Sequence, residues 1–132
     1  MKQLYYSAIF ICLLLLVNAC TGITPSSAVK HLAESIKTGN YAAAAQNFAS
    51  ESNDKKAFIE YLKHKEEDFA QQGGIRSYTI MGEAVTPDES KAYVRIRYTF
   101  NNNSTVDELI SLVKSGGQWK YTLPASPGIV QK

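Results

Sequence analysis

The chain has 132 residues, of which 45% are hydrophobic and 20% charged, and 14 basic residues against 12 acidic ones give a net charge of +2. This length and composition predict one globular domain and exclude a low-complexity or collagen-like protein. The near-neutral charge excludes the strongly basic patterning of nucleic-acid binding proteins, so we expect no nucleic-acid partner.

The first 19 residues have the pattern of an export signal. Lys2 gives a positive start, residues 4–17 are almost wholly apolar, and the small Ala19 precedes Cys20. The apolar stretch is shorter than the roughly 20 residues of a membrane span, and no basic residue closely follows it. We therefore predict that residues 1–19 are a signal peptide that is removed on export.

The residues Val17-Asn18-Ala19-Cys20 resemble the bacterial lipoprotein signal. The resemblance implies that Cys20 carries fatty-acyl chains such as palmitate, becomes the first mature residue and anchors the protein to a membrane. Cys12 would leave with the signal, so no internal disulfide can form. Two or three acyl chains would make the attachment essentially permanent. The alternative is an ordinary secreted protein with one unpaired thiol.

Residues 20–24 are the expected lipidated cysteine and tether, followed by one domain over 25–123 and a tail over 124–132. Thr21 stands beside Cys20 where an aspartate would resemble an inner-membrane retention signal. We therefore expect an envelope protein facing the periplasm, on the outer membrane rather than the inner one.

Helical periodicity governs the first half of the domain. Thr24-Pro25 predicts a helix start and Gly39 its end, and Asn40 caps a second short helix that begins at Tyr41. The longest helical pattern covers 54–71 and stops at Gly73-Gly74. His31 and His64 fall on polar faces, so we expect no metal site and no cofactor.

The pattern then changes to a period of two, which predicts four antiparallel strands over 75–85, 91–100, 105–114 and 119–123. If Phe100 pairs with Thr105, Arg97 faces Glu108 and Tyr98 faces Asp107 in the core. Ile110 and Leu112 would then join Tyr93 and Arg95 on the outer face, which would suggest a covered face or a self-association patch. A slip of one residue would exchange the two faces.

Several segments resemble a family of small bacterial lipoproteins whose domain of unknown function is similar to the nuclear-transport-factor-2-like (cystatin-like) α+β fold. They are Thr24-Pro25, Ala28-Val29, residues 36–44, Ala92-Tyr93-Val94 and Gly117-Gln118-Trp119-Lys120. The resemblance implies an α+β fold in which N-terminal helices pack on a curved four-stranded antiparallel sheet and form a cone with a pocket at its open end.

We expect a non-catalytic module that binds a small ligand or an envelope partner. The candidate pocket residues are the aromatic and charged side chains on the expected inner faces: Phe58, Tyr61, Lys65, Phe69, Tyr98, Asp107 and Trp119. The structural alternative is that the aromatic residues are plain core, and that Lys65 packs its stem while its ammonium reaches water.

Two other functions stay open. An acid–base enzyme would use Asp107 beside Tyr98, with Glu83 in reserve, because such catalysis needs a carboxylate in an apolar pocket next to a hydrogen-bond donor. A structural role would use a homodimer through the outer sheet face.

Overall fold

The computed structural model describes residues 23–49 and 52–122. The predicted signal peptide, Cys20 and the tail lie outside this part of the chain. Helices and strands follow one another as α2 (Pro25–Thr38), α3 (Tyr41–Ala45), α4 (Ser52–Ala70), β1 (Ile75–Val85), β2 (Lys91–Phe100), β3 (Thr105–Ser115) and β4 (Gln118–Tyr121). Among these helices, none combines the length and the apolarity needed to cross a bilayer.

The helix boundaries follow the local chemistry that the sequence indicated. The Thr24 hydroxyl accepts a hydrogen bond from the Ser27 amide at 3.1 Å, and Pro25 takes a position in the first turn of α2. Gly39 ends α2 in the left-handed conformation at φ 72°, which glycine adopts without a steric penalty. Asn40 then caps α3 through the Ala43 amide at 3.4 Å.

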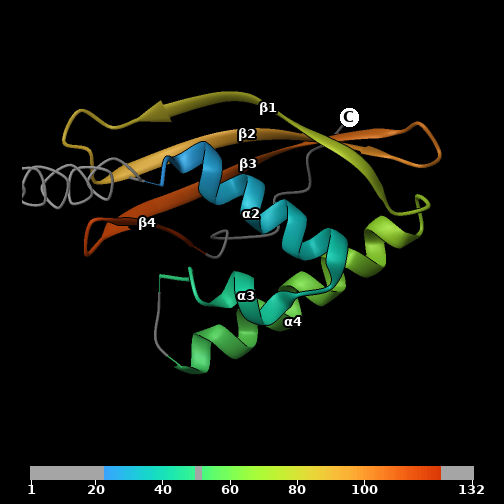
Figure 1. Ribbon diagram of the computed structural model, residues 1–132, viewed down its shortest axis with the longest axis horizontal. Helices are drawn as coiled ribbons and strands as arrows, with labels where there is room; N and C mark the ends of the chain where they lie inside the picture. Colours follow the sequence, from blue (N-terminus) through green and yellow to red (C-terminus); the bar gives the residue numbers. More distant parts are fainter. Residues whose placement is uncertain (1–22, 50–51, 123–132) are drawn as a thin grey trace, which may run out of the picture.

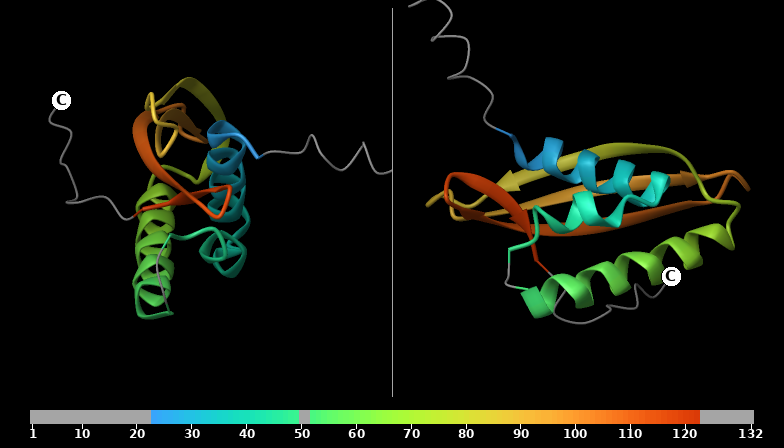
Figure 2. Two further views of the ribbon diagram at one scale, coloured as in Figure 1. Left: turned by 90° about the vertical axis from the view of Figure 1, so that its left-hand side faces the viewer. Right: turned by 60° about the horizontal axis from the view of Figure 1, so that its bottom comes forward.

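The four strands form one antiparallel sheet in the order β1-β2-β3-β4, so every strand pairs with its neighbour in sequence (Figure 1). Short turns allow only this arrangement. Together with the preceding helices, the sheet confirms the predicted α+β fold class. Seen end-on, the sheet curves around the helices (Figure 2).

The predicted register of the central hairpin is wrong by one residue. Thr105 pairs with Thr99 instead of Phe100, because residues 101–103 form a three-residue loop that ends in Asn103 at φ 67°. The Phe100 amide donates to the Ser104 carbonyl at 2.9 Å, as in hairpins closed by a turn and a left-handed residue. A one-residue shift exchanges the faces of β3, so Glu108 lies on the inner face and Asp107 on the outer one.

The hydrophobic core lies between the inner face of the sheet and the helices. Alternate residues of β2 are fully buried, from Ala92 to Phe100, and α2 crosses this face in contact with β1, β2 and β4 (Figure 2). Stacked aromatic rings join α4 to the rest: Phe58 lies 4.4 Å from Phe48 and 6.0 Å from Tyr121 between ring centroids.

The outer face of the sheet differs from the prediction. Ile110 and Leu112 are buried in the core, so they cannot belong to an outer patch. The large exposed hydrophobic residues on the outer positions of β2 and β3 are Tyr93 and Leu109, which are 39% and 61% exposed. The expected self-association patch around Arg95 is therefore much smaller than the sequence suggested.

Candidate functional site

A small cavity of about 40 Å³ lies between α4 and β3. Phe58, Tyr61 and Lys65 line it from α4, and residues 108–111 line it from β3. Phe58, Tyr61 and Lys65 were all predicted pocket residues, and they share one face of α4 because helix positions three and four apart are neighbours. The cavity has room for about one or two water molecules.

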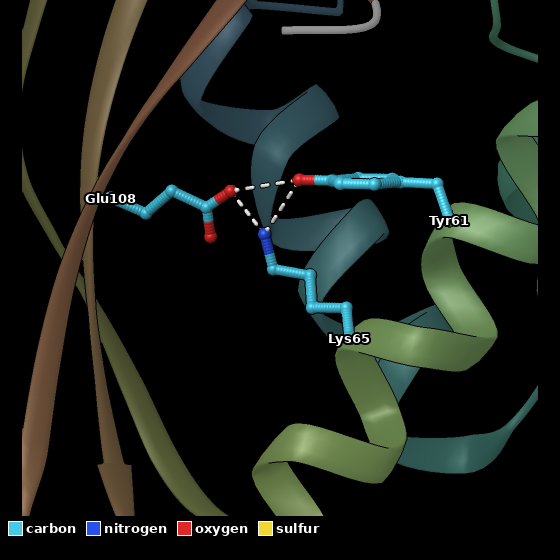
Figure 3. A network of polar contacts seen from close by, with 3 residues as sticks. All are labelled: Tyr61, Lys65 and Glu108. Carbon is cyan, nitrogen blue, oxygen red and sulfur yellow. Dashed lines mark hydrogen bonds and ion pairs between the residues drawn. The ribbon is translucent and has the colours of Figure 1, made fainter. Parts of the chain in front are cut away.

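Three polar side chains meet at this cavity (Figure 3). The Lys65 ammonium forms an ion pair with Glu108 Oε1 and donates to the Tyr61 hydroxyl at 3.1 Å. The Tyr61 hydroxyl lies 3.4 Å from the same Glu108 oxygen. The Lys65 and Glu108 side chains are only 12% and 21% exposed, so water screens their attraction weakly.

The sequence left open whether the Lys65 ammonium lies at a pocket or reaches water, and the structure places it at the α4–β3 cavity. Its ammonium lies 5.2 Å from the Tyr61 ring centroid and 5.8 Å from that of Phe69, so the charge sits among aromatic rings. It does not face solvent as a free cation, because Glu108 neutralises it. An anion could reach Lys65 only by competing with the Glu108 carboxylate.

Glu108 is the residue of this cluster that the sequence analysis missed. The alternation of side chains in β3 could have identified it, because Glu108 shares a face with Ile110 and Leu112, which are both buried. The assumed hairpin register placed all three on the outer face. A register chosen to bury Ile110 and Leu112 would have brought Glu108 to Lys65.

Tyr98 and Phe69 do not line the α4–β3 cavity, and their rings contact each other with 4.9 Å between ring centroids. Tyr98 is fully buried, and its hydroxyl has no hydrogen-bond partner within the described part of the chain. Burial, and secondarily the charge of Glu108, raise the pKa of Tyr98 well above its ordinary value. Phe69 also lines a separate cavity of about 90 Å³, with Lys37 and Glu66.

The structure does not form the predicted acid–base pair of Asp107 and Tyr98. Asp107 lies on the outer face, where Arg97 Nε and Nη2 donate to its two oxygens at 2.6 and 2.9 Å. This hydrogen bonding lowers the pKa of Asp107. Val106, not Asp107, is the residue opposite Tyr98.

Glu83, the reserve carboxylate, holds the start of α2. The Ser26 amide donates to Glu83 Oε2 at 2.9 Å, and the Ser26 hydroxyl donates to the same oxygen. A carboxylate at a helix N-terminus is stabilised by the unpaired amides and the helix dipole. In this structure the Glu83 carboxylate caps α2 and does not act as a free carboxylate.

Trp119 does not line the α4–β3 cavity. It lines a third cavity, of about 250 Å³. This cavity, the Trp119 cavity, opens between the start of α2 and the β3–β4 turn. Its principal lining residues are Ile23, Ser27, His31, Asn47, Gln118 and Trp119. The predicted single pocket is thus divided among several separate spaces.

No three His, Cys, Asp or Glu side chains within residues 23–49 and 52–122 lie close enough together to hold a metal ion. His64 pairs with Glu67 at 3.4 Å on the exposed side of α4.

The family model for a domain of unknown function, DUF4878, matches residues 18–122. The chain belongs to this family. No curated protein sequence matches this DUF4878 protein significantly.

Two solved structures share its fold. A Campylobacter jejuni crystal structure, provisionally named an NTF2-like transpeptidase, aligns with a TM-score of 0.62 at 14% identity, over 76% of this chain and 100% of the other. The solution structure of a SEC-C motif-containing protein from Rhodopseudomonas palustris aligns with a TM-score of 0.55 at 11% identity, over 83% of each chain. The DUF4878 protein therefore has an NTF2-like fold, as the resemblance of its sequence implied.

Proposed function

We propose that this DUF4878 protein is a lipid-anchored protein of the bacterial cell envelope that binds a small ligand or an envelope partner without catalysing a reaction. Anchoring is supported by the sequence around Cys20 and by the start of the fold at Thr24, a few residues later. We infer no transpeptidase activity from the name of the structural neighbour, because a similarity at 14% identity indicates a shared fold and not a shared function.

Binding is supported above all by the Lys65–Glu108 pair. It lies at a cavity between a helix and a sheet, and Tyr61 contributes a hydroxyl to both charged groups. Pairs of this kind are weak sources of stability, because removing two charges from water offsets most of their attraction. A ligand with an anionic group could take the place of Glu108 on Lys65.

The cavity is too small for a ligand while the pair is closed, since it holds only about 40 Å³. Entry therefore requires the pair to open and α4 to move away from β3. In this movement Phe58 would separate from the Tyr121 ring, and Phe69 from the rings of Tyr98 and Phe100.

The anchoring arm of the proposal is tested with Cys20→Ser in the full chain. We expect the wild type to fractionate with membranes and to carry the mass of acyl chains on a mature chain that begins at Cys20. Cys20→Ser should lose the acyl mass and the cleavage at this site. An identical mass and an identical fractionation for both proteins would rule out the anchor.

The binding arm is tested by native mass spectrometry of the acylated protein purified from its own envelope. We expect a bound molecule that is lost in Lys65→Met, because this variant removes the cation and keeps an unbranched side chain that is one atom shorter. Lys63→Met, the same change at an exposed lysine of α4 that pairs with Glu60, is the matched control and should keep the molecule. A molecule lost equally in both variants, or none in the wild type, contradicts binding at the α4–β3 cavity.

A further inference from the structure

The Trp119 cavity has the dimensions of a binding site in its own right. Its volume is about 250 Å³, whereas an engineered apolar cavity of roughly 150 Å³ binds benzene. Drug-sized ligands occupy larger pockets, of roughly 300 Å³ and more. A slender apolar chain or a single ring is therefore the shape that fits.

One side of this cavity is apolar. Trp119 is almost fully buried and Ala28 is buried, while Ile23 is 55% exposed at the mouth. An isoleucine left in water beside a hollow can bury its surface against a ligand, which contributes about 25 cal/mol for each Å² removed from water.

The other side offers hydrogen-bond donors. The side-chain amides of Asn47 and Gln118 and the Trp119 indole N–H have no hydrogen-bond partner among residues 23–49 and 52–122. The Lys114 ammonium lies 5.5 Å from the Trp119 ring centroid, and no carboxylate of the described chain pairs with it. Amide and indole donors beside a cation suit a carboxylate.

The cavity also lies close to the expected membrane surface. Ile23 follows Cys20 by three residues, which span at most about 11 Å when fully extended. If Cys20 carries the anchor, the mouth of the cavity is held near the bilayer. This point rests on the proposed function, whereas the shape and the chemistry of the cavity do not.

We propose that the Trp119 cavity binds a free fatty acid. A segment of the acyl chain lies against Ile23 and Trp119, and the carboxylate is held at the rim by Gln118 and Asn47, with Lys114 supplying the positive charge. This site is separate from the Lys65–Glu108 cavity and requires no movement of α4.

The test uses a chain that begins at Thr21 and has no anchor. All described helices, strands and buried core residues lie between Pro25 and Tyr121, so this chain contains the whole fold. Trp119 is the one tryptophan of the sequence, so its fluorescence reports on this cavity alone. We expect dibromostearate to quench this fluorescence in a saturable way, and unbrominated stearate to restore it.

Three variants make the test specific. Ile23→Glu should weaken binding about tenfold or more, since it places a negative charge at the apolar mouth. Leu109→Glu, on the outer sheet face, is the matched control and should leave binding unchanged. Lys114→Glu should weaken binding of dibromostearate several-fold and leave that of its methyl ester, which lacks the charge, unchanged.

Three results obtained with the chain from Thr21 alone would overturn the proposal. They are non-saturable quenching, equal losses in Ile23→Glu and Leu109→Glu, and equal binding of acid and ester by every variant. Quenching in the chain from Thr21 but not in the acylated protein would show the anchor's own acyl chain in the cavity, and would also overturn it. None of these results bears on whether Cys20 is acylated, which the mass of Cys20→Ser decides.

Discussion

Two buried tyrosines of the core differ in one hydrogen bond. The Tyr121 hydroxyl donates to the Ala28 carbonyl, whereas the Tyr98 hydroxyl has no partner within the described chain. Burial raises the pKa of both residues, so both hydroxyls stay protonated at neutral pH. A buried hydroxyl without a partner costs roughly 1–3 kcal/mol.

We expect Tyr98→Phe to raise the free energy of unfolding by about 1 kcal/mol, because it removes a desolvated hydroxyl and keeps the ring. Tyr121→Phe should lower it by about 1 kcal/mol, because the buried hydrogen bond from the Tyr121 hydroxyl to the Ala28 carbonyl is lost. Urea unfolding at neutral pH measures both. A loss in Tyr98→Phe as large as that in Tyr121→Phe would show that a bound water or ligand pairs with Tyr98.

The stabilising effect of the turn between β1 and β2 depends on the ionisation of Asp88, and therefore on pH. The Thr86 hydroxyl donates to its carboxylate at 2.6 Å and the Ser90 amide at 3.1 Å, and these bonds lower the pKa of Asp88 from 3.8 to about 2. A carboxyl whose pKa is lower in the folded state stabilises the fold above its unfolded pKa and loses this effect as the pH falls.

We therefore expect wild type to be more stable than Asp88→Ala at pH 6, and this advantage to shrink from about pH 4 and to be mostly lost by about pH 2. Urea unfolding across this pH range provides the measurement. Glu89→Ala changes the neighbouring carboxylate and serves as the control. An advantage that stays constant down to pH 2 would contradict the role of the ionised carboxylate.

At the scale of elements, the contact between α2 and β1 depends on Glu83. Its carboxylate accepts two hydrogen bonds from Ser26 in the first turn of α2, a turn that contains no acidic residue of its own. Glu83 thus supplies from β1 the negative charge that favours a helix N-terminus. It also ties the first turn of α2 to β1, as the Tyr78 hydroxyl does farther along the helix by donating to Glu34 at 3.0 Å.

We expect Glu83→Gln to lower the free energy of unfolding by about 0.5–1 kcal/mol, because the charge is lost while the shape is kept. Since the site is exposed, this difference should decrease at high salt. Urea unfolding at low and high ionic strength measures it, with Glu89→Gln as the control. Equal stabilities of Glu83→Gln and wild type at low salt would refute a charge effect.

At the scale of the whole molecule, the revised register changes the expectation for self-association. Burial of Ile110 and Leu112 leaves Tyr93 and Leu109 as large exposed hydrophobic residues on the outer faces of β2 and β3. Arg97 and Asp107 form an ion pair on the same face. Stable homodimers bury larger and more apolar surfaces.

We therefore expect the chain from Thr21 to sediment as a monomer at tens of micromolar. Sedimentation velocity measures this, and Leu109→Glu should sediment like the wild type. A wild-type dimer that Leu109→Glu dissociates would restore the interface that the sequence suggested.

The sequence by itself determined the elements and their order. Thr24-Pro25, Gly39 and Asn40 predicted the ends of α2 and α3, and the change of period after Gly73-Gly74 predicted β1 and β2 with their observed bounds. These features depend on local hydrogen bonds and backbone angles, which a few neighbouring residues fix. For this reason the fold class could be predicted without tertiary information.

Only the tertiary structure decided which side chains meet. The left-handed Asn103 shifted the hairpin by one residue, which moved Asp107 out of the core and brought Glu108 to Lys65. Likewise, Trp119 lines a cavity with Ile23 because the start of α2 lies beside the β3–β4 turn. Such meetings depend on the register of strands and on how helices cross the sheet, and these are set by the packing of the whole core.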